Sequence, residues 1–214
     1  MAYTAILTNI GILILSILAG LFTFYLISDL PKEEKKKQAE EITSQIINFI
    51  LFIWLGKIIL HLGIFIQDPL AVLAYPSNSH ALYLGLLFTS LAIAYKKYKQ
   101  KIEVSSFILS FVPVFLVASF VYEFIEVVWR DNFYHWKYLT LLLILLGAYL
   151  ILHNRLSKWK LIWVTLTGWI AGQLLLSYLM PYTTAFGYTM APWFLILFYI
   201  ASSSLIFFRK KVFK

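Results

Sequence analysis

The sequence has no cysteine and few charged residues. Of its 214 residues, 13% are charged and 61% are hydrophobic, and the mean hydropathy is +0.81. The lack of cysteine excludes disulfides, thiolate nucleophiles and cysteine-ligated metal or iron–sulfur sites. Because an ordinary soluble domain is close to half apolar, this composition predicts an integral membrane protein.

Acidic residues are scarcer than basic ones. There are 10 Asp and Glu against 18 Lys and Arg, so the formal net charge is +8. In a membrane protein such a surplus normally reports topology rather than nucleic-acid binding. No polar segment is long enough to form a recognition module, so we expect no nucleic-acid partner.

Long apolar stretches make up most of the sequence. A helix needs roughly 20 mostly apolar residues to cross a bilayer. Seven stretches meet or approach this length: 5–27, 43–66, 80–95, 104–128, 137–153, 160–180 and 189–208. The sequence therefore predicts an all-α polytopic membrane protein with seven transmembrane helices, in which residues 1–214 form one domain.

Most basic residues lie in the loops that follow every second apolar stretch. Fifteen of the 18 follow the first, third, fifth and seventh stretches, whereas the opposite loops contribute Arg130 and Lys137. The fifteen are Lys32, Lys35, Lys36, Lys37, Lys96, Lys97, Lys99, Lys101, Arg155, Lys158, Lys160, Arg209, Lys210, Lys211 and Lys214. The positive-inside rule then places the N-terminus outside and the C-terminus in the cytoplasm. We expect a multi-pass protein of the cell membrane, such as a bacterial cytoplasmic membrane.

The most polar stretch is 29–41, between the first two spans. Its alternating charges predict a short cytoplasmic helix supported by local ion pairs. We favour a solvated connector near anionic headgroups over a docking site for a partner.

Three charges lie near the end of the fourth span. Glu123, Glu126 and Arg130 recur at helical spacing, so they share one face, and the last two form an i,i+4 pair. Ionisable residues inside a membrane are costly without a partner and are treated by default as a functional-site hypothesis. The predicted partner is Lys57 of the second span, one helical turn from His61.

Two interpretations of this polar set stay open. It is either a structural ion pair that locks two helices, or a polar cavity that receives an anionic headgroup or passes protons. In the second interpretation the substrate-binding candidates are Lys57, His61, Arg130 and His135. The catalytic candidates are Glu123, Glu126 and His80, since a carboxylate or a histidine at the outer surface can act as a general base.

Motifs for cofactors are lacking. His61, His80, His135 and His153 are far apart, and no HExxH motif predicts a metal site. The sequence also has no Gly-rich phosphate loop and no GxSxG elbow. We expect no metal and no other cofactor.

From the second span onward the order of features resembles the bacterial prolipoprotein diacylglyceryl transferase family. The similar pieces are Gly56–Lys57, Asp68–Val72, Ala81–Leu87, Ile93–Lys99 and Phe133–Trp136. The His-Gly-Gly and Gly-Arg-x-Gly-Asn-Phe signatures of that family have no counterpart here, so its essential arginine and asparagine are not carried over. The resemblance implies a divergent relative with seven spans and an outer N-terminus.

Two functions remain open from the sequence. The resemblance implies a membrane protein that binds a phospholipid or lipid-linked substrate in an intramembrane polar cavity, with transferase chemistry as an extension. The alternative is a small transporter or a membrane subunit of a larger complex, in which the same charges form a gate or contact a membrane-protein partner.

Overall fold

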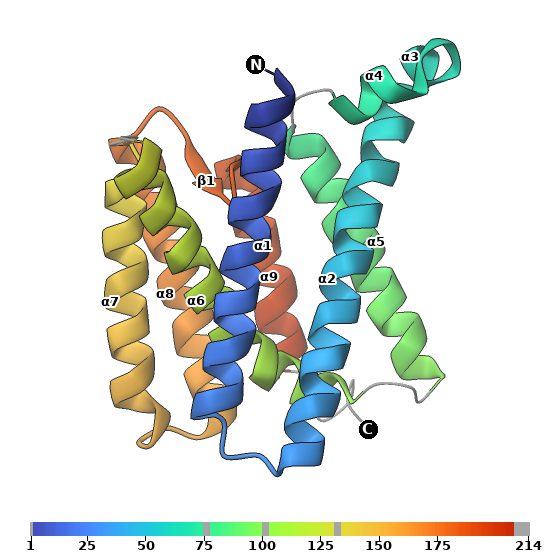
Figure 1. Ribbon diagram of the computed structural model, residues 1–214. Coiled ribbons are helices and arrows are strands. Elements are labelled where there is room, and N and C mark those ends of the chain that lie inside the picture. Colours follow the sequence, from blue (N-terminus) through green and yellow to red (C-terminus); the bar gives the residue numbers. More distant parts are fainter. Residues whose placement is uncertain (1, 75–77, 100–102, 131–133, 208–214) are drawn as a thin grey trace. The chain divides into compact units, whose positions relative to one another are not determined.

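The computed structural model describes residues 2–74, 78–99, 103–130 and 134–207, and these are almost entirely helical (Figure 1). The helices are α1 (Ala2–Ile27), α2 (Lys32–Leu60), α3 (Leu62–Gln67), α4 (Pro69–Ala74), α5 (Ser79–Tyr98), α6 (Val104–Arg130), α7 (Trp136–His153), α8 (Lys158–Leu179) and α9 (Pro192–Phe207). A short hairpin of β1 (Thr183–Ala185) and β2 (Tyr188–Met190) precedes α9. The prediction of an all-α fold is confirmed.

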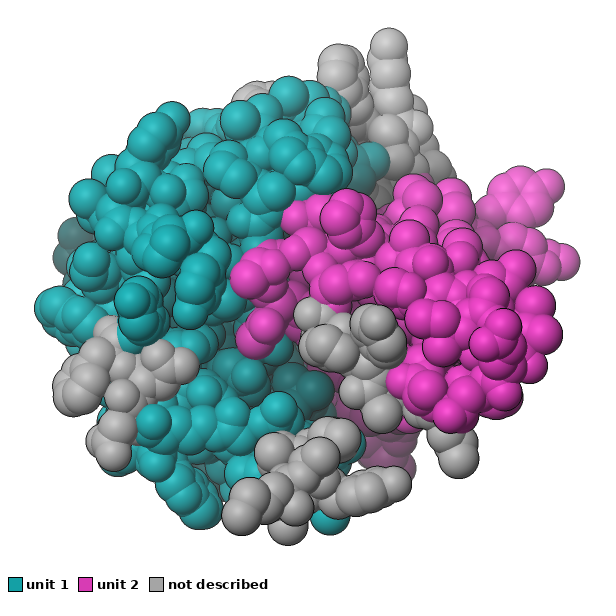
Figure 2. All heavy atoms as spheres, turned by 90° about the horizontal axis from the view of Figure 1, so that it is seen from above, with its two compact units in different colours: residues 1–30, 108–186, 190–214 teal, residues 31–107, 187–189 magenta. Residues whose placement is uncertain are grey.

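The chain divides into two compact units, coloured separately in Figure 2. Unit 1 comprises residues 1–30, 108–186 and 190–214, and therefore holds α1, most of α6, α7, α8 and α9. Unit 2 comprises residues 31–107 and 187–189, and holds α2 to α5.

In unit 1 the helices pack as successive neighbours. Helix α8 contacts both α7 and α9. Helices α1 and α6 approach closely at Gly20, where an added Cβ would lie 2.6 Å from the carbonyl oxygen of Val114. A small residue allows this approach between apolar helices, which have no hydrophobic driving force toward each other in lipid.

The first strand of the hairpin belongs to unit 1. Between its strands the backbone turns through Phe186 and Gly187, which both have positive φ. The ring of Phe186 packs edge-on against Tyr122 and Phe115 of α6. The side chain of Thr183 is buried and donates a hydrogen bond to the carbonyl oxygen of Met190 at 3.4 Å.

In unit 2, helices α2 and α5 form the main packed pair. Gly85 of α5 lies against Ile53 of α2, where an added Cβ would be 3.2 Å from the Ile53 backbone nitrogen. Nearer the start of α2, Lys96 forms an ion pair with Glu41 at 3.0 Å. Asn78 caps the start of α5 by accepting a hydrogen bond from the Ala81 backbone N–H at 2.7 Å.

Five of the described helices are long and apolar enough to cross a membrane: α1, α2, α6, α7 and α8. They overlap five of the predicted spans, and the protein has the character of a multi-pass membrane protein. Predicted spans 80–95 and 189–208 are also helical, as α5 and α9, but neither is among these five. Helix α5 carries Lys96 and Lys97 in its last turn, and α9 has 16 residues. The count of seven and the orientation of the termini stay predictions.

Helix α2 differs from the prediction at both ends. The polar stretch 29–41 does not form a separate short helix, because α2 begins at Lys32 and continues through Leu60. Glu33 and Glu34 lie in its first turn, where they complement the helix dipole. The helix ends before 66 because His61 leaves the helical conformation, and the last part of the predicted span belongs to α3.

Candidate functional site

The charges of the fourth predicted span lie on α6 in unit 1, and the structure gives each glutamate a partner close in sequence. Glu123 is fully buried, and its Oε2 accepts a hydrogen bond from Nδ1 of His135. This contact also counts as an ion pair when the histidine is protonated. A buried carboxylate is costly unless a partner compensates it. His135, which immediately precedes α7, supplies that partner.

The second pair lies one turn further along α6. Glu126 is 5% exposed, and its Oε1 lies 3.1 Å from Nη1 of Arg130. The other terminal nitrogen of Arg130 donates a hydrogen bond to Oδ1 of Asn9 in α1. The Arg130 side chain is about one-third exposed, so its guanidinium is held in place on two sides and still reachable from outside.

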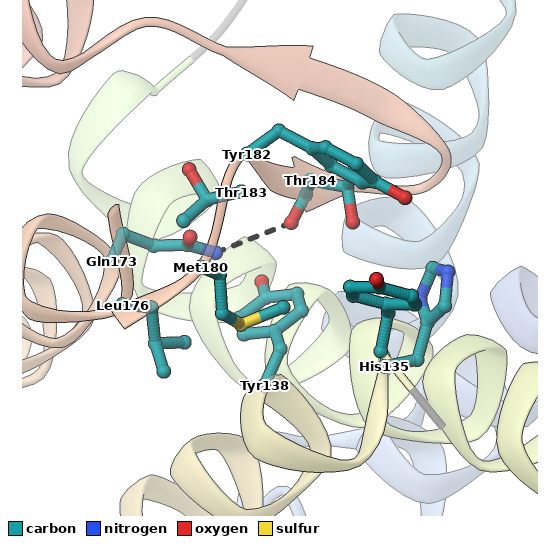
Figure 3. A pocket seen from close by; sticks show the side chains of 9 residues that line it. His135, Tyr138, Gln173, Leu176, Met180, Tyr182, Thr183 and Thr184 are labelled. Carbon is teal, nitrogen blue, oxygen red and sulfur yellow. Dashed lines mark hydrogen bonds between the residues drawn. The ribbon is translucent and has the colours of Figure 1, made fainter. Parts of the chain in front are cut away.

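A small pocket opens beside His135, and it has room for a group about the size of one water molecule. Figure 3 shows His135 at one side of this pocket and Gln173 at the other, with Tyr182, Thr183 and Thr184 along the rim. Its remaining lining residues are Tyr134, Tyr138, Leu176 and Met180. Glu123 is not among the lining residues, so its contact with the pocket runs through His135.

Tyr138 and Gln173 form the buried wall of the pocket. The Trp169 indole N–H of α8 donates a hydrogen bond to the Tyr138 hydroxyl of α7 at 2.8 Å, which joins the two helices. Gln173 is fully buried, and its amide N–H donates to the carbonyl oxygen of Thr184 at 3.3 Å. Its Oε1 is buried and has no hydrogen-bond partner among the described residues.

Aromatic rings stand at the pocket mouth. Tyr134 and Tyr182 are both about half exposed, and their rings stack with centroids 6.1 Å apart. Tyrosines gather at the interface between membrane and water, where one end of the ring is wet. The two half-exposed tyrosines are therefore typical of a pocket at the interface between membrane and water.

The remaining predicted site residues belong to unit 2. Lys57 is buried near the end of α2, and His61 is the residue at which that helix ends. His80 is exposed in the first turn of α5. A pairing of Lys57 with Glu123 or Glu126 would join the two units, and it stays a prediction. The structure does show that both glutamates have other partners within unit 1.

Sequence reasoning overlooked three site residues. Asn9 was missed because a single asparagine near the start of an apolar span carries no pattern. Tyr138 was missed because a tyrosine at the start of a span is typical of an interfacial anchor, and Gln173 because it sits in an uncharged, mostly apolar stretch. The available signal was the presence of an amide inside the sixth predicted span, since an intramembrane polar group needs a partner.

Comparison with known proteins adds no relative: no protein-family model, curated protein or solved structure matches this chain. The resemblance to the diacylglyceryl transferase family therefore rests on the sequence pieces given above. No three His, Asp or Glu side chains in the described part of the chain gather as a metal site.

The electrostatics at the end of α6 centre on His135. The hydrogen bond to Glu123 raises the pKa of His135 above its usual value near 6.5, and the charges of Glu123 and Glu126 act in the same direction. Partial burial and the positive charge of Arg130 act against this. A raised pKa in the folded state means that the pair stabilises the fold fully below about pH 6.5, and that this contribution is lost as the pH rises through the raised value.

This linkage predicts a pH-dependent difference between the wild type and His135→Gln. The thermal stability of the purified protein in mild detergent should exceed that of the variant most clearly near pH 6, and the difference should shrink toward pH 9. His80→Gln is the matched control, because His80 is exposed and should show no such trend. A constant difference between wild type and His135→Gln over this range would contradict the assigned pair.

Proposed function

We propose that this protein binds the headgroup of a phospholipid or lipid-linked molecule at the polar site of unit 1. The observation that carries the proposal is the presence of Arg130, His135 and a small pocket at one end of long apolar helices. Apolar helices give access to lipid chains, and a cationic group at the interface attracts a phosphate.

Arg130 is the proposed phosphate ligand. A guanidinium has five N–H donors in a rigid fork. The contacts with Glu126 and Asn9 occupy part of that fork and fix its direction, while the partial exposure leaves donors for a ligand. Lys137 lies nearby in the chain and its ammonium donates to the carbonyl oxygen of Leu179 at 3.5 Å, at the same end of unit 1.

We also propose the predicted orientation, with seven crossing helices, the N-terminus outside and the site at the outer surface. The distribution of charge within unit 1 supports it. Arg155, Lys158 and Lys160 lie between α7 and α8 or at the start of α8, at the end opposite to the site. Positive residues favour the cytoplasmic side, so the site end is assigned to the outside.

His135 is the proposed general base if the bound lipid is also a substrate. Its Nδ1 contacts the Glu123 carboxylate, which fixes the ring and leaves Nε2 for a proton of the ligand. A carboxylate that orients a histidine in this way is a recurring arrangement in acid–base catalysis. The geometry thus favours His135 as the base and Glu123 as the residue that positions it. Lipid binding itself requires no such chemistry.

The orientation predicts opposite labelling of two single-cysteine variants. Ser157 and Pro181 are exposed at the two ends of α8. In intact cells an impermeant thiol reagent should label Pro181→Cys, and it should label Ser157→Cys only after permeabilisation. The natural chain has no cysteine, so the background is low. Labelling of both variants from outside would contradict the orientation.

The lipid proposal predicts that Arg130→Gln weakens lipid retention. A charge-assisted hydrogen bond contributes roughly 1.5–3 kcal/mol, so co-purifying phospholipid in mild detergent should fall about tenfold or more by native mass spectrometry. Expression should be nearly unchanged. The matched control is Arg155→Gln, an exposed arginine at the opposite end of unit 1. If Arg130→Gln retains as much lipid as the control, then Arg130 is an interfacial anchor and the proposal fails.

A further inference from the structure

Arg130 has one charged partner and one neutral partner. Glu126 is almost fully buried, and its Oε1 lies 3.1 Å from Nη1 of Arg130. This oxygen accepts no hydrogen bond from the described residues, so the pair is held by charge. The other terminal nitrogen of Arg130 donates to the neutral Oδ1 of Asn9. Glu126 therefore compensates the charge of the guanidinium, whereas Asn9 orients the guanidinium without adding a charge.

The stretch of chain around this contact carries no surplus of positive charge. Between residues 123 and 137, three acidic residues stand against three basic ones when His135 is counted as protonated. The acidic residues are Glu123, Glu126 and Asp131, and the basic ones are Arg130, His135 and Lys137. Asp131 lies outside the described residues. By contrast, the segment 154–160 that leads into α8 contains basic residues and no acidic one.

The described charges at this end of unit 1 act on one another. The pKa of His135 is raised chiefly by its hydrogen bond with Glu123, and the charges of Glu126 and Arg130 also act on it, in opposite directions. Partly buried charges are screened much less by salt than exposed ones. A phosphate bound at Arg130 would therefore be attracted by the guanidinium and repelled by the nearby carboxylates.

We infer that Glu126 restricts the Arg130 site to phosphodiesters, whose phosphate carries one negative charge, and disfavours phosphomonoesters, whose phosphate carries two. The inference rests on the proposed lipid function, because it names the class of headgroup that Arg130 accepts. The guanidinium matches the first charge of the ligand. The second charge of a phosphomonoester meets no further uncompensated cation and is repelled by the carboxylate of Glu126.

The two partners of Arg130 have different consequences for specificity. A carboxylate beside a phosphate-binding arginine weakens the binding of every anion, but it weakens the binding of a doubly charged anion more. Specificity is a difference of affinities, and a repulsive element contributes to it. Asn9 supplies an oxygen acceptor of the same kind without the charge. With an aspartate in its place, two carboxylates would flank the guanidinium, and the site would repel a phosphodiester as well.

The test compares two lipids that differ by one methyl group and one charge. Phosphatidylmethanol is a phosphodiester and phosphatidic acid is a phosphomonoester, and both are used with the same acyl chains. Each is added to delipidated protein in mild detergent at about pH 8.5, where the phosphomonoester is doubly charged because its second pKa is about 6. Bound lipid is quantified by mass spectrometry after gel filtration. We expect the wild type to retain phosphatidylmethanol at least about threefold better than phosphatidic acid, as a modest repulsion implies.

Two variants change the charge beside Arg130 in opposite directions. Glu126→Gln keeps the shape and removes the carboxylate, so retention of phosphatidic acid should rise about tenfold and the preference should disappear. Asn9→Asp keeps the acceptor and adds a charge, so retention of both lipids should fall, with phosphatidic acid affected more. The matched control is Glu41→Gln, the same change in the ion pair with Lys96 of unit 2, which should keep the preference.

Three outcomes overturn the inference. The first is equal retention of the two lipids by the wild type, or a preference for phosphatidic acid. The second is an unchanged preference in Glu126→Gln, because another group then selects the lipid. The third is unchanged retention of both lipids in Asn9→Asp, which decides the matter if Glu126→Gln does not fold.

The variant Arg130→Gln separates this inference from the proposed function. If it lowers retention of both lipids while one of these outcomes is observed, the proposed function stands and this inference alone fails. If Arg130→Gln changes nothing, the proposed function fails and takes the inference with it.

Discussion

The polar end of unit 1 depends on one buried carboxylate. Glu123 lies within a mostly apolar helix and is fully shielded from solvent, an arrangement that is unfavourable unless a donor compensates the charge. His135 provides the donor from the residue immediately before α7. The contact therefore fixes where α7 begins relative to the end of α6, and it places His135 at the edge of the pocket formed with α8 and the hairpin.

The other contacts at this end extend the same polar network. Arg130 links α6 to α1 through Asn9, Trp169 links α8 to α7 through Tyr138, and Gln173 links α8 to β1 through Thr184. In lipid such bonds take over part of the role that the hydrophobic effect has in soluble bundles. The opposite end of unit 1 carries Arg155, Lys158 and Lys160. One end thus carries the polar network, and the other carries a cluster of basic residues.

Much of the fold could be predicted because apolar length and helical spacing are local properties. The bounds of α6, α7 and α8 follow the predicted spans 104–128, 137–153 and 160–180 closely. The spacing of Glu126 and Arg130 predicted a shared face, and they pair at 3.1 Å. The length of α2 was harder to predict. A polar segment followed by an apolar one fits either two separate helices or one continuous helix, and helix propensity does not distinguish the two cases.

The partner of Glu123 was beyond the reach of sequence spacing. Charge complementarity suggested Lys57, which lies far away in the chain, whereas His135 lies 12 residues away across a change of helix. A histidine after the end of a span resembles a surface residue, and only the fold shows that it turns back toward α6. Gln173 was overlooked for a related reason, since its role depends on Thr184 and on the pocket rather than on any motif.

The most direct test of the account is a double-mutant cycle between Glu123 and His135. Unfolding free energies in detergent would be measured near pH 6 for the wild type, Glu123→Gln, His135→Gln and the double variant. The account predicts a coupling free energy of roughly 1–3 kcal/mol, as for a charge-assisted hydrogen bond between buried partners. A coupling near zero would show that these side chains do not meet, and the site described here would be wrong.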